Sequence, residues 1–210
     1  MTTFIPVFPL DIVVFPGEML NLHIFEPRYI EMIKEKIIDK KPFGIPSVIN
    51  KVYNELGTTL EITEVVKEYE NGELDIRTRG INVFRILQPI HEIPEKLYSG
   101  AIVTFPENTI RYDDSNISKL ILQEVKRLYS LLNAEAKFPV HKQEAISYEI
   151  GHFVGFSKEQ EYDLLGLFTE VQRMEYIRRH LNNILPVVKE LEALKARIQM
   201  NGHFRDLSLE

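Results

Sequence analysis

The uneven placement of proline divides this sequence into two parts of different character. Nine of the eleven prolines lie before residue 107, and the remaining two are Pro139 and Pro186. In the first part, short runs rich in Val, Ile, Phe and Tyr alternate with Gly, Pro and Asn, a pattern typical of short strands joined by turns. The change falls near Asp113 and Asp114. We therefore predict an α+β fold, with a β-rich subdomain over residues 1–112 and a helical bundle over residues 113–210.

Local signals place a hairpin in the β-rich part. Residues 58–70 and 73–78 flank Asn71–Gly72, a dipeptide that accepts the positive φ angles of a type I′ turn. The alternation of apolar and charged residues after this turn predicts a half-buried strand with a charged outer face. Gly80 is expected to bend the chain before residues 82–90 continue as another strand.

Apolar residues at three- and four-residue spacing predict helices in both parts. The first helix starts at Pro27, since proline is favourable at the first helical position, and its apolar face comprises Tyr29, Ile30, Ile33, Ile37 and Ile38. A second helix begins near Ser115, with an apolar face comprising Ile117, Leu120, Ile121, Val125, Leu128, Leu131 and Leu132. A third helix covers residues 145–154 and ends at Gly155.

Two capping boxes mark the start of two further helices. Residues 157–160 and 169–172 each place a hydroxyl and an amide where they can satisfy unpaired backbone donors. The last helix carries one long apolar stripe: Val171, Met174, Ile177, Leu181, Leu185, Val188, Leu191, Leu194 and Ile198. Pro186 lies inside this stripe and is expected to kink the helix, because proline removes one backbone hydrogen bond.

The composition is that of a folded chain, and it fits a reducing compartment. Hydrophobic residues make up 44% and charged residues 27%, near the globular average. The absence of cysteine excludes disulfides, thiolate metal sites and cysteine nucleophiles. Three prolines interrupt residues 1–19, which also lack a basic segment, so we expect neither a signal peptide nor a membrane span. We therefore expect the protein to be cytoplasmic and to have no membrane partner.

The charge balance disfavours a nucleic-acid partner. The formal net charge is -6 at pH 7. Residues 1–110 hold 11 basic against 16 acidic residues, and residues 111–210 hold 14 against 15. Neither half has the basic surplus on which phosphate-backbone binding depends.

Motifs for catalysis are absent from the sequence. The glycines form neither of the phosphate-binding patterns GxxxxGK[S/T] and GxGxxG. The six histidines are scattered, and Glu149 and His152 form a single Glu-x-x-His pair where a di-iron site needs two. We therefore expect no catalytic residues, no metal, no cofactor and no enzymatic activity.

Two segments resemble the N-terminal substrate-recognition domain of Lon proteases, the LON domain. FIPVFPLDIVVFPGEMLNLHIFEPRYIEMI, residues 4–33, resembles the opening of that domain. GTTLEITEVVKEYENGELDIRTRGINVFRIL, residues 57–87, resembles its strand, hairpin and Arg-Gly-x-x-x-Phe-Arg-Ile block. The resemblance implies a PUA-like six-stranded β pseudo-barrel followed by a C-terminal helical bundle. The long, kinked last helix of that bundle is predicted from the apolar stripe and Pro186.

The same resemblance implies a function. Complete Lon proteases continue into an ATPase module and a serine-lysine protease domain, and this sequence contains neither. It is therefore similar to the stand-alone LON-domain proteins of bacteria. Such a protein is expected to be a non-catalytic module that binds unfolded or misfolded polypeptides, or docks to a protease or chaperone partner. RNA binding is the alternative, since PUA-like barrels in other families bind structured RNA.

Three groups of residues are candidates for protein binding. Arg28 and Tyr29 belong to the motif that opens the first helix, and Arg79 and Arg85 could form a positive patch. The third group lies on the last helix, where it could support a homo-oligomer: Leu191, Leu194 and Ile198. Each group also has a structural alternative, namely motif architecture, a solvated strand face, and packing on the chain's own bundle.

Overall fold

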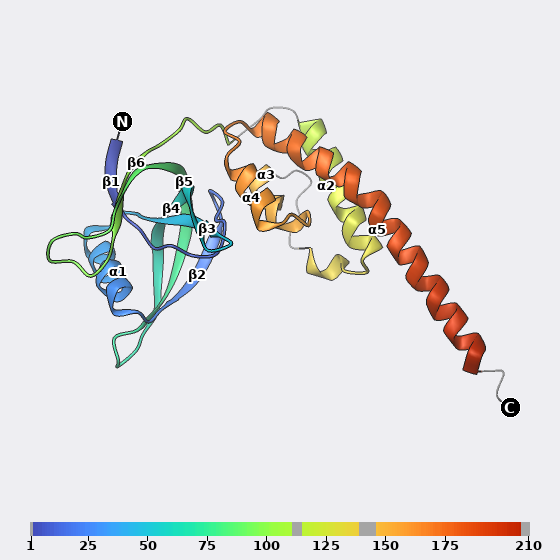
Figure 1. The fold of residues 1–210 in the computed structure, drawn as a ribbon, viewed down its shortest axis with the longest axis horizontal. Helices are drawn as coiled ribbons and strands as arrows, with labels where there is room; N and C mark the ends of the chain where they lie inside the picture. Colours follow the sequence, from blue (N-terminus) through green and yellow to red (C-terminus); the bar gives the residue numbers. More distant parts are fainter. Residues whose placement is uncertain (1, 111–114, 139–145, 207–210) are drawn as a thin grey trace. The chain divides into compact units, whose positions relative to one another are not determined.

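The computed structural model describes residues 2–110, 115–138 and 146–206, and they form two compact units (Figure 1). The first unit comprises Met1–Ile110 with Phe156–Thr169, and the second comprises Arg111–Gly155 with Glu170–Glu210. The sequence suggested a single boundary after residue 112. The structure instead groups residues 156–169, which come late in the chain, with the β-rich unit.

The first unit is built on a six-stranded antiparallel sheet, as predicted. Its order is β1-β6-β5-β4-β3, and β2 pairs with β5 beside this path. The strands are β1 (Thr2–Pro6), β2 (Met19–Ile24), β3 (Phe43–Ile49), β4 (Val52–Glu68), β5 (Leu74–Ile90) and β6 (Gly100–Thr104). After β1 the chain returns to β3 through parallel bridges from Val7 to Gly44 and from Leu10 to Ser47, so the sheet curls back on itself. The predicted likeness of this sheet to PUA barrels stays a prediction.

The β4–β5 hairpin is confirmed, but its predicted turn type is wrong. The Gly72 N–H donates to the Tyr69 carbonyl at 2.9 Å, and the Tyr69 N–H donates to the Glu73 carbonyl at 2.9 Å. Gly72 has a φ of 87°, whereas Asn71 is not among the residues with positive φ. A type I′ turn needs positive φ at both. The hairpin therefore uses a longer loop, in which an ordinary turn is followed by one left-handed glycine.

The prediction that a new strand begins after Gly80 is also wrong. β5 runs without interruption from Leu74 to Ile90. Gly80 instead admits a close neighbour, because a Cβ there would lie 2.4 Å from the Phe15 carbonyl oxygen. The Gly17 N–H donates to the Gly80 carbonyl at 2.9 Å, and the Gly80 N–H donates to the Glu18 carbonyl at 2.8 Å. The glycine thus joins the segment before β2 to the sheet.

Helix α1 (Pro27–Asp39) begins at Pro27 as predicted and covers the main core of the first unit. Tyr29, Met32 and Ile33 pack against strand residues that include Phe43, Ile45, Leu60, Leu74 and Ile76. Ile38 was expected on this face and is 81% exposed. It lies five residues after Ile33, which places it about 140° around the helix, on the solvent side. Met32 takes a core position that the sequence pattern missed.

The remaining elements are helical. They are α2 (Ser115–Leu131), η1 (Glu135–Lys137), α3 (Ser147–Ile150), η2 (Gly151–Phe153), α4 (Lys158–Leu165) and α5 (Glu170–Asp206). The helix expected over residues 145–154 is the short α3 followed by the 3₁₀ turn η2, and Ala145 lies outside the described residues. Gly155 follows with a φ of 79°, which ends this segment as predicted.

The capping box at the start of α4 is confirmed. The Ser157 hydroxyl accepts from the Gln160 N–H at 3.3 Å, and the Gln160 side chain accepts from the Ser157 N–H at 2.9 Å. α4 belongs to the β-rich unit. The Tyr162 hydroxyl accepts from the Leu56 N–H of β4 at 3.3 Å, and Lys158 pairs with Asp11 at 2.7 Å.

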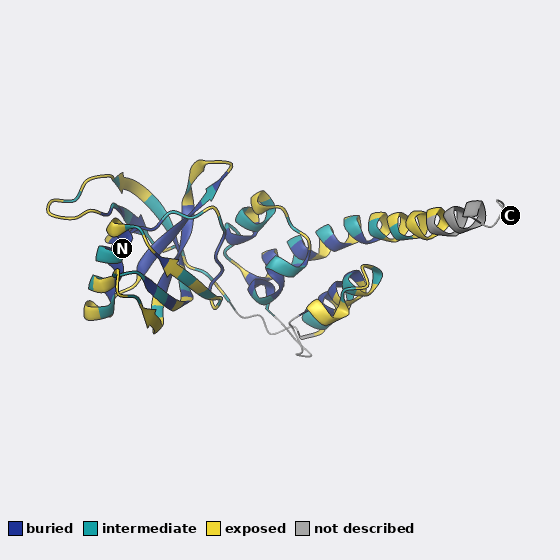
Figure 2. Ribbon diagram, turned by 90° about the horizontal axis from the view of Figure 1, so that it is seen from below, coloured by how far each residue is buried: buried dark blue, intermediate teal, exposed yellow. Residues whose placement is uncertain are grey.

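The last helix, α5, is 37 residues long and continues through Pro186. Its first half is buried at Met174, Ile177, Leu181 and Leu185. Figure 2 shows the change along the helix, from buried and intermediate residues in the first half to exposed residues in the second. The long stripe expected from the sequence is therefore covered over only part of its length. A kink at Pro186 stays a prediction.

Candidate functional site

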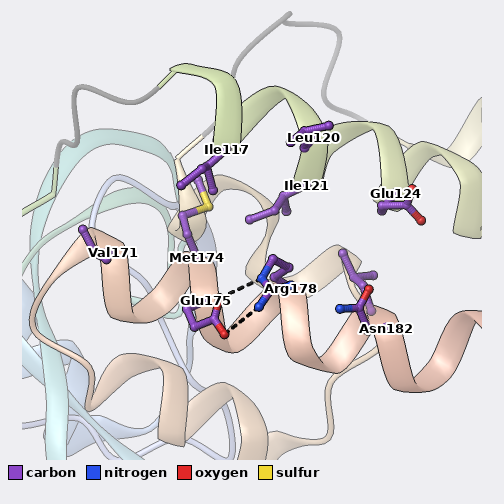
Figure 3. Close-up of a pocket in the computed structure, with 10 residues that line it drawn as sticks. Ile117, Leu120, Ile121, Glu124, Val171, Met174, Glu175, Arg178 and Asn182 are labelled. Carbon is purple, nitrogen blue, oxygen red and sulfur yellow. Dashed lines mark hydrogen bonds and ion pairs between the residues drawn. The ribbon is translucent and has the colours of Figure 1, made fainter.

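An apolar groove lies between α2 and the first half of α5 (Figure 3). It has a volume of about 450 Å³. Helix α2 contributes Ile117, Leu120, Ile121 and Glu124, and α5 contributes Val171, Met174, Glu175, Arg178, Leu181 and Asn182. Both sets follow the three- and four-residue spacing that brings side chains to one side of a helix. Each helix therefore contributes two neighbouring rows of side chains to the groove.

The groove has a buried floor and an exposed apolar wall on each helix. Ile121, Met174 and Leu181 form the floor and are 2%, 4% and 1% exposed. Leu120 on α2 and Val171 on α5 are 61% and 46% exposed. In Figure 3, Ile117 and Met174 face each other between the two helices. Large apolar side chains thus stay accessible beside a packed floor, which is typical of a surface that binds another molecule.

The charged residues at the rim of the groove form ion pairs with residues of their own helix. Glu175 accepts hydrogen bonds from Arg178 at 2.7 and 2.9 Å and from Arg179 at 2.7 Å. These bonds lower the pKa of Glu175 to about 2. Glu124 lies 3.5 Å from Arg127 on α2. The rim therefore carries paired charges of both signs around an apolar centre, the arrangement found in protein–protein interfaces.

A buried ion pair holds the first turn of α5, from which Val171 and Met174 reach the groove. The Arg173 guanidinium donates to the Glu170 carboxylate at 2.8 Å, and the two residues are 0% and 2% exposed. The Ser147 N–H and hydroxyl of α3 each donate to Glu170 at 2.6 Å. Arg173 also donates to the Ser147 hydroxyl at 2.8 Å. Burial of a charge is tolerated when it is paired and hydrogen-bonded in this way.

Arg28 and Tyr29, the first pair of predicted site residues, have different environments. Tyr29 is buried in the core, with its ring centroid 4.0 Å from that of Phe8, and burial raises the pKa of its hydroxyl. Arg28 is exposed, donates to Glu26 at 2.7 and 2.9 Å, and lies over the Tyr29 ring at 4.6 Å. Of the two, only Arg28 is exposed to solvent.

Arg79 and Arg85 lie on β5 among acidic neighbours. Arg79 is exposed and sits opposite Glu61 of β4. The Arg85 Nε lies 3.9 Å from a carboxylate oxygen of Glu55, and its guanidinium lies 5.9 Å from the centre of the Phe168 ring. Arg77 on the same strand pairs with Glu64. Each arginine of this strand therefore has a carboxylate across the hairpin.

Leu191, Leu194 and Ile198, the third predicted group, are exposed on the second half of α5. They belong to the second compact unit, whereas the four residues above belong to the first. The predicted residues thus lie on three different elements, and the binding role of each group stays a prediction.

Sequence reasoning missed the groove because it assigned Leu120 to the covered face of α2. The structure buries Leu122, Val125 and Leu128 there and leaves Leu120 largely open. One signal was present in the sequence. The apolar positions of α2 include both Ile117 and Leu120 beside Ile121, which makes a face wider than one neighbouring helix covers.

The described residues also bear on metal binding and on membrane insertion. No group of three or more His, Asp or Glu side chains that could hold a metal occurs among the described residues. None of the helices within residues 2–110, 115–138 and 146–206 has both the length and the apolar character needed to cross a membrane.

Solved structures establish the class of fold. The crystal structure of a Lon N-terminal domain protein from Xanthomonas campestris matches with a TM-score of 0.63 and 21% identity, covering 84% of this chain and 98% of that one. The N-terminal domain of a Mycobacterium avium complex Lon protease matches with a TM-score of 0.58 and 16% identity, covering 86% and 98%. The fold is therefore that of Lon N-terminal domains. No curated protein matches the sequence.

The family follows from a match over most of the chain. Residues 5–183 match the model of the ATP-dependent protease La (LON) substrate-binding domain. The chain belongs to this family, as the resemblance of residues 4–33 and 57–87 implied. The matched region includes all of α2 and the part of α5 up to Asn182, which together line the groove. It ends before the exposed second half of α5.

Proposed function

We propose that this protein is a non-catalytic polypeptide-binding module and that the groove between α2 and α5 accepts apolar side chains of unfolded segments. The observation that carries the proposal is the exposure of Leu120 and Val171 beside the buried floor. Unfolded chains differ from folded ones in offering large apolar side chains, and their burial supplies the binding free energy. Membership of a substrate-binding family supports a protein ligand.

The size and polarity of the groove fit such a ligand. Its volume of about 450 Å³ can hold a few large side chains at a time. Binding by a few side chains, without matched hydrogen-bond donors deep in the groove, favours apolar composition over a particular sequence. The compensated charges of Glu175 and Arg178 do not impose a strong charge preference. A separate protease or chaperone partner, and a cytoplasmic location, stay predictions of the sequence.

RNA binding has less support. The net charge is -6, and the arginines of β5 lie opposite carboxylates. Nucleic-acid binding depends on release of counterions by unpaired basic groups, so its affinity falls steeply with salt. Hydrophobic capture tolerates salt. The salt dependence of binding therefore separates the two functions.

The test uses a permanently unfolded, carboxymethylated polypeptide as a fluorescent probe. The double variant Leu120→Glu/Val171→Glu removes two apolar walls, and each loss is worth about 1.5 kcal/mol or more if the side chain is covered in the complex. We expect about a hundredfold weaker binding or more. The control Ile38→Glu changes an even more exposed apolar residue, on α1, and should bind as the wild type does.

Two results would contradict the proposal. One is equal affinity of the double variant and the wild type for the unfolded probe, with far-UV circular dichroism showing both folded. The other is preferential binding of a structured RNA, with an affinity that falls by about a thousandfold between 50 and 200 mM salt.

A further inference from the structure

The second half of α5 carries an exposed apolar seam, defined here as Val187, Leu191, Leu194 and Ile198. These side chains are 64%, 49%, 53% and 62% exposed. Successive members are four, three and four residues apart. This is the spacing of the two apolar positions in a coiled-coil heptad, where a second helix covers the seam. A ligand bound in the groove would not cover the seam, because the groove lies along the first half of α5.

The low stability of short, unpacked helices in water favours a covered seam. A helical segment of about twelve residues is marginal in water unless an apolar face packs on something. The described part of α5 nevertheless continues as helix to Asp206. A partner for the seam would supply the missing packing.

We propose that the occupant of the seam is the same segment of a second copy of this chain, running antiparallel. In that arrangement Leu191 faces Leu194 of the second copy, and Val187 faces Ile198 of the second copy. All four seam residues of each chain are then covered. Glu190 and Arg197 flank the seam on one side, both exposed. Antiparallel pairing places Glu190 next to Arg197 of the second copy, twice by symmetry, so the flanking charges are complementary.

The burial of the first half of α5 selects the antiparallel direction. Ile177, Ile184, Leu191 and Ile198 are seven residues apart and so form one strip along the helix. Ile177 is fully buried in its own unit, and a Cβ placed on Gly155 would lie 3.7 Å from the Ile184 side chain. The chain's own residues therefore cover this strip as far as Ile184.

In a parallel pair the covered strips of the two copies would lie side by side. Each strip is already packed against residues of its own chain, so the two copies could not approach each other there. An antiparallel pair overlaps through the open seam and sends the two covered halves to opposite ends. Four side chains per copy make a small interface, well below the area of a standard stable dimer, so we expect a weak, concentration-dependent dimer.

Sedimentation of the full chain over about 5 to 500 µM tests the dimer, because small interfaces dissociate in this range. The wild type should change from monomer to dimer, and Leu191→Asp/Leu194→Asp should stay monomeric while keeping its far-UV spectrum. Ile38→Asp is the control and should dimerise normally. A wild type that is monomeric throughout, or a Leu191→Asp/Leu194→Asp variant that still dimerises, overturns the proposal.

Two further experiments test the direction. Glu190→Lys should weaken the dimer several-fold, and addition of Arg197→Glu should restore it; a parallel pair would instead be restored by Lys195→Glu.

Because the chain has no cysteine, a mixture of the Leu191→Cys and Leu194→Cys proteins reports directly which residues are in contact. We expect the mixed disulfide to form faster than either symmetric one. Faster symmetric crosslinking of Leu191→Cys overturns the antiparallel arrangement. The groove variant Leu120→Glu/Val171→Glu should dimerise normally, so the two proposals can fail separately.

Discussion

Replacing Arg173 with methionine should destabilise the helical unit strongly. Arg173 is fully buried and neutralises Glu170, which is 2% exposed. Methionine fills much of the same volume but carries no charge. In Arg173→Met the Glu170 carboxylate would stay buried, and its remaining donors among the described residues would be the Ser147 N–H and hydroxyl. An uncompensated buried charge is costly because the protein interior replaces the lost hydration poorly.

The magnitude follows from the contacts that remain. Removal of one member of a buried ion pair costs about 3–5 kcal/mol. The two donors of Ser147 keep the loss near the lower limit, while loss of the contact between Arg173 and the Tyr148 ring, 4.1 Å away, adds to it. We expect Arg173→Met to lower the free energy of unfolding by about 3–4 kcal/mol. The double variant Glu170→Gln/Arg173→Met keeps an acceptor for Ser147 without the charge, and should recover about 1.5 kcal/mol or more of this loss.

Urea unfolding followed by far-UV circular dichroism measures the effect, since the helical unit supplies most of the helical signal and the chain has no tryptophan. Arg178→Met is the matched control. Arg178 lies on the same helix and pairs with Glu175, but its side chain is 52% exposed, so its loss should cost less than about 1 kcal/mol. The reasoning is refuted if Arg173→Met costs no more than Arg178→Met. A double variant as unstable as Arg173→Met would also refute it.

Three further predictions concern other parts of the chain. Gly80→Ala should cost about 1–3 kcal/mol in thermal unfolding, because the new Cβ would lie 2.4 Å from the Phe15 carbonyl oxygen. Ser157→Ala removes a helix cap and should cost about 1 kcal/mol, measured by urea unfolding, with Ser157→Gly closer to the wild type. Burial lowers the pKa of His180 below 6.5 despite its bond to the Val154 carbonyl, so the unfolded state binds the proton more readily. Stability should therefore fall as the pH drops from 6.5 through the folded pKa, and urea midpoints of His180→Gln should show a flatter pH profile.

Signals that act within a few residues predicted the fold well. Pro27 and the capping box at Ser157 each mark the start of a helix through a local backbone constraint, and both helices begin there. Asn71–Gly72 identified the hairpin, but the sequence could not determine its turn type, because loop length depends on how β4 and β5 pair. Gly80 was misread for a similar reason. Its role is to admit the segment near Phe15, which is 65 residues away in sequence.

The placement of α4 was beyond the reach of a local pattern. The change of composition near residue 113 indicated that everything after it belongs to a helical bundle. Yet α4 joins the β-rich unit through contacts such as that of Tyr162 with Leu56, 106 residues apart. A short amphipathic helix carries the same periodicity whichever apolar surface it covers, so its partner cannot be deduced from its own residues.

The candidate site shows the same limit. Helical periodicity identified the apolar rows of α2 and α5 but could not say which rows a neighbour covers. The structure buries Leu122 and exposes Leu120, and it covers the α5 stripe as far as Leu185. Leu191 and Leu194 were recognised in the sequence as candidates for contact with a partner, and they are exposed. Their role in binding another chain stays a prediction.

The two halves of α5 should respond differently to loss of the buried ion pair. Glu170 and Arg173 fix the first turn of α5 to α3. Val171 and Met174, which come from the same turn, contribute to the wall and to the floor of the groove. The seam begins at Val187, more than three helical turns further on, and its residues are exposed in the described part of the chain. Arg173→Met, studied where it is still folded, should therefore weaken capture of an unfolded polypeptide while leaving self-association unchanged. Equal loss of both activities would mean that the groove and the seam act as a single surface.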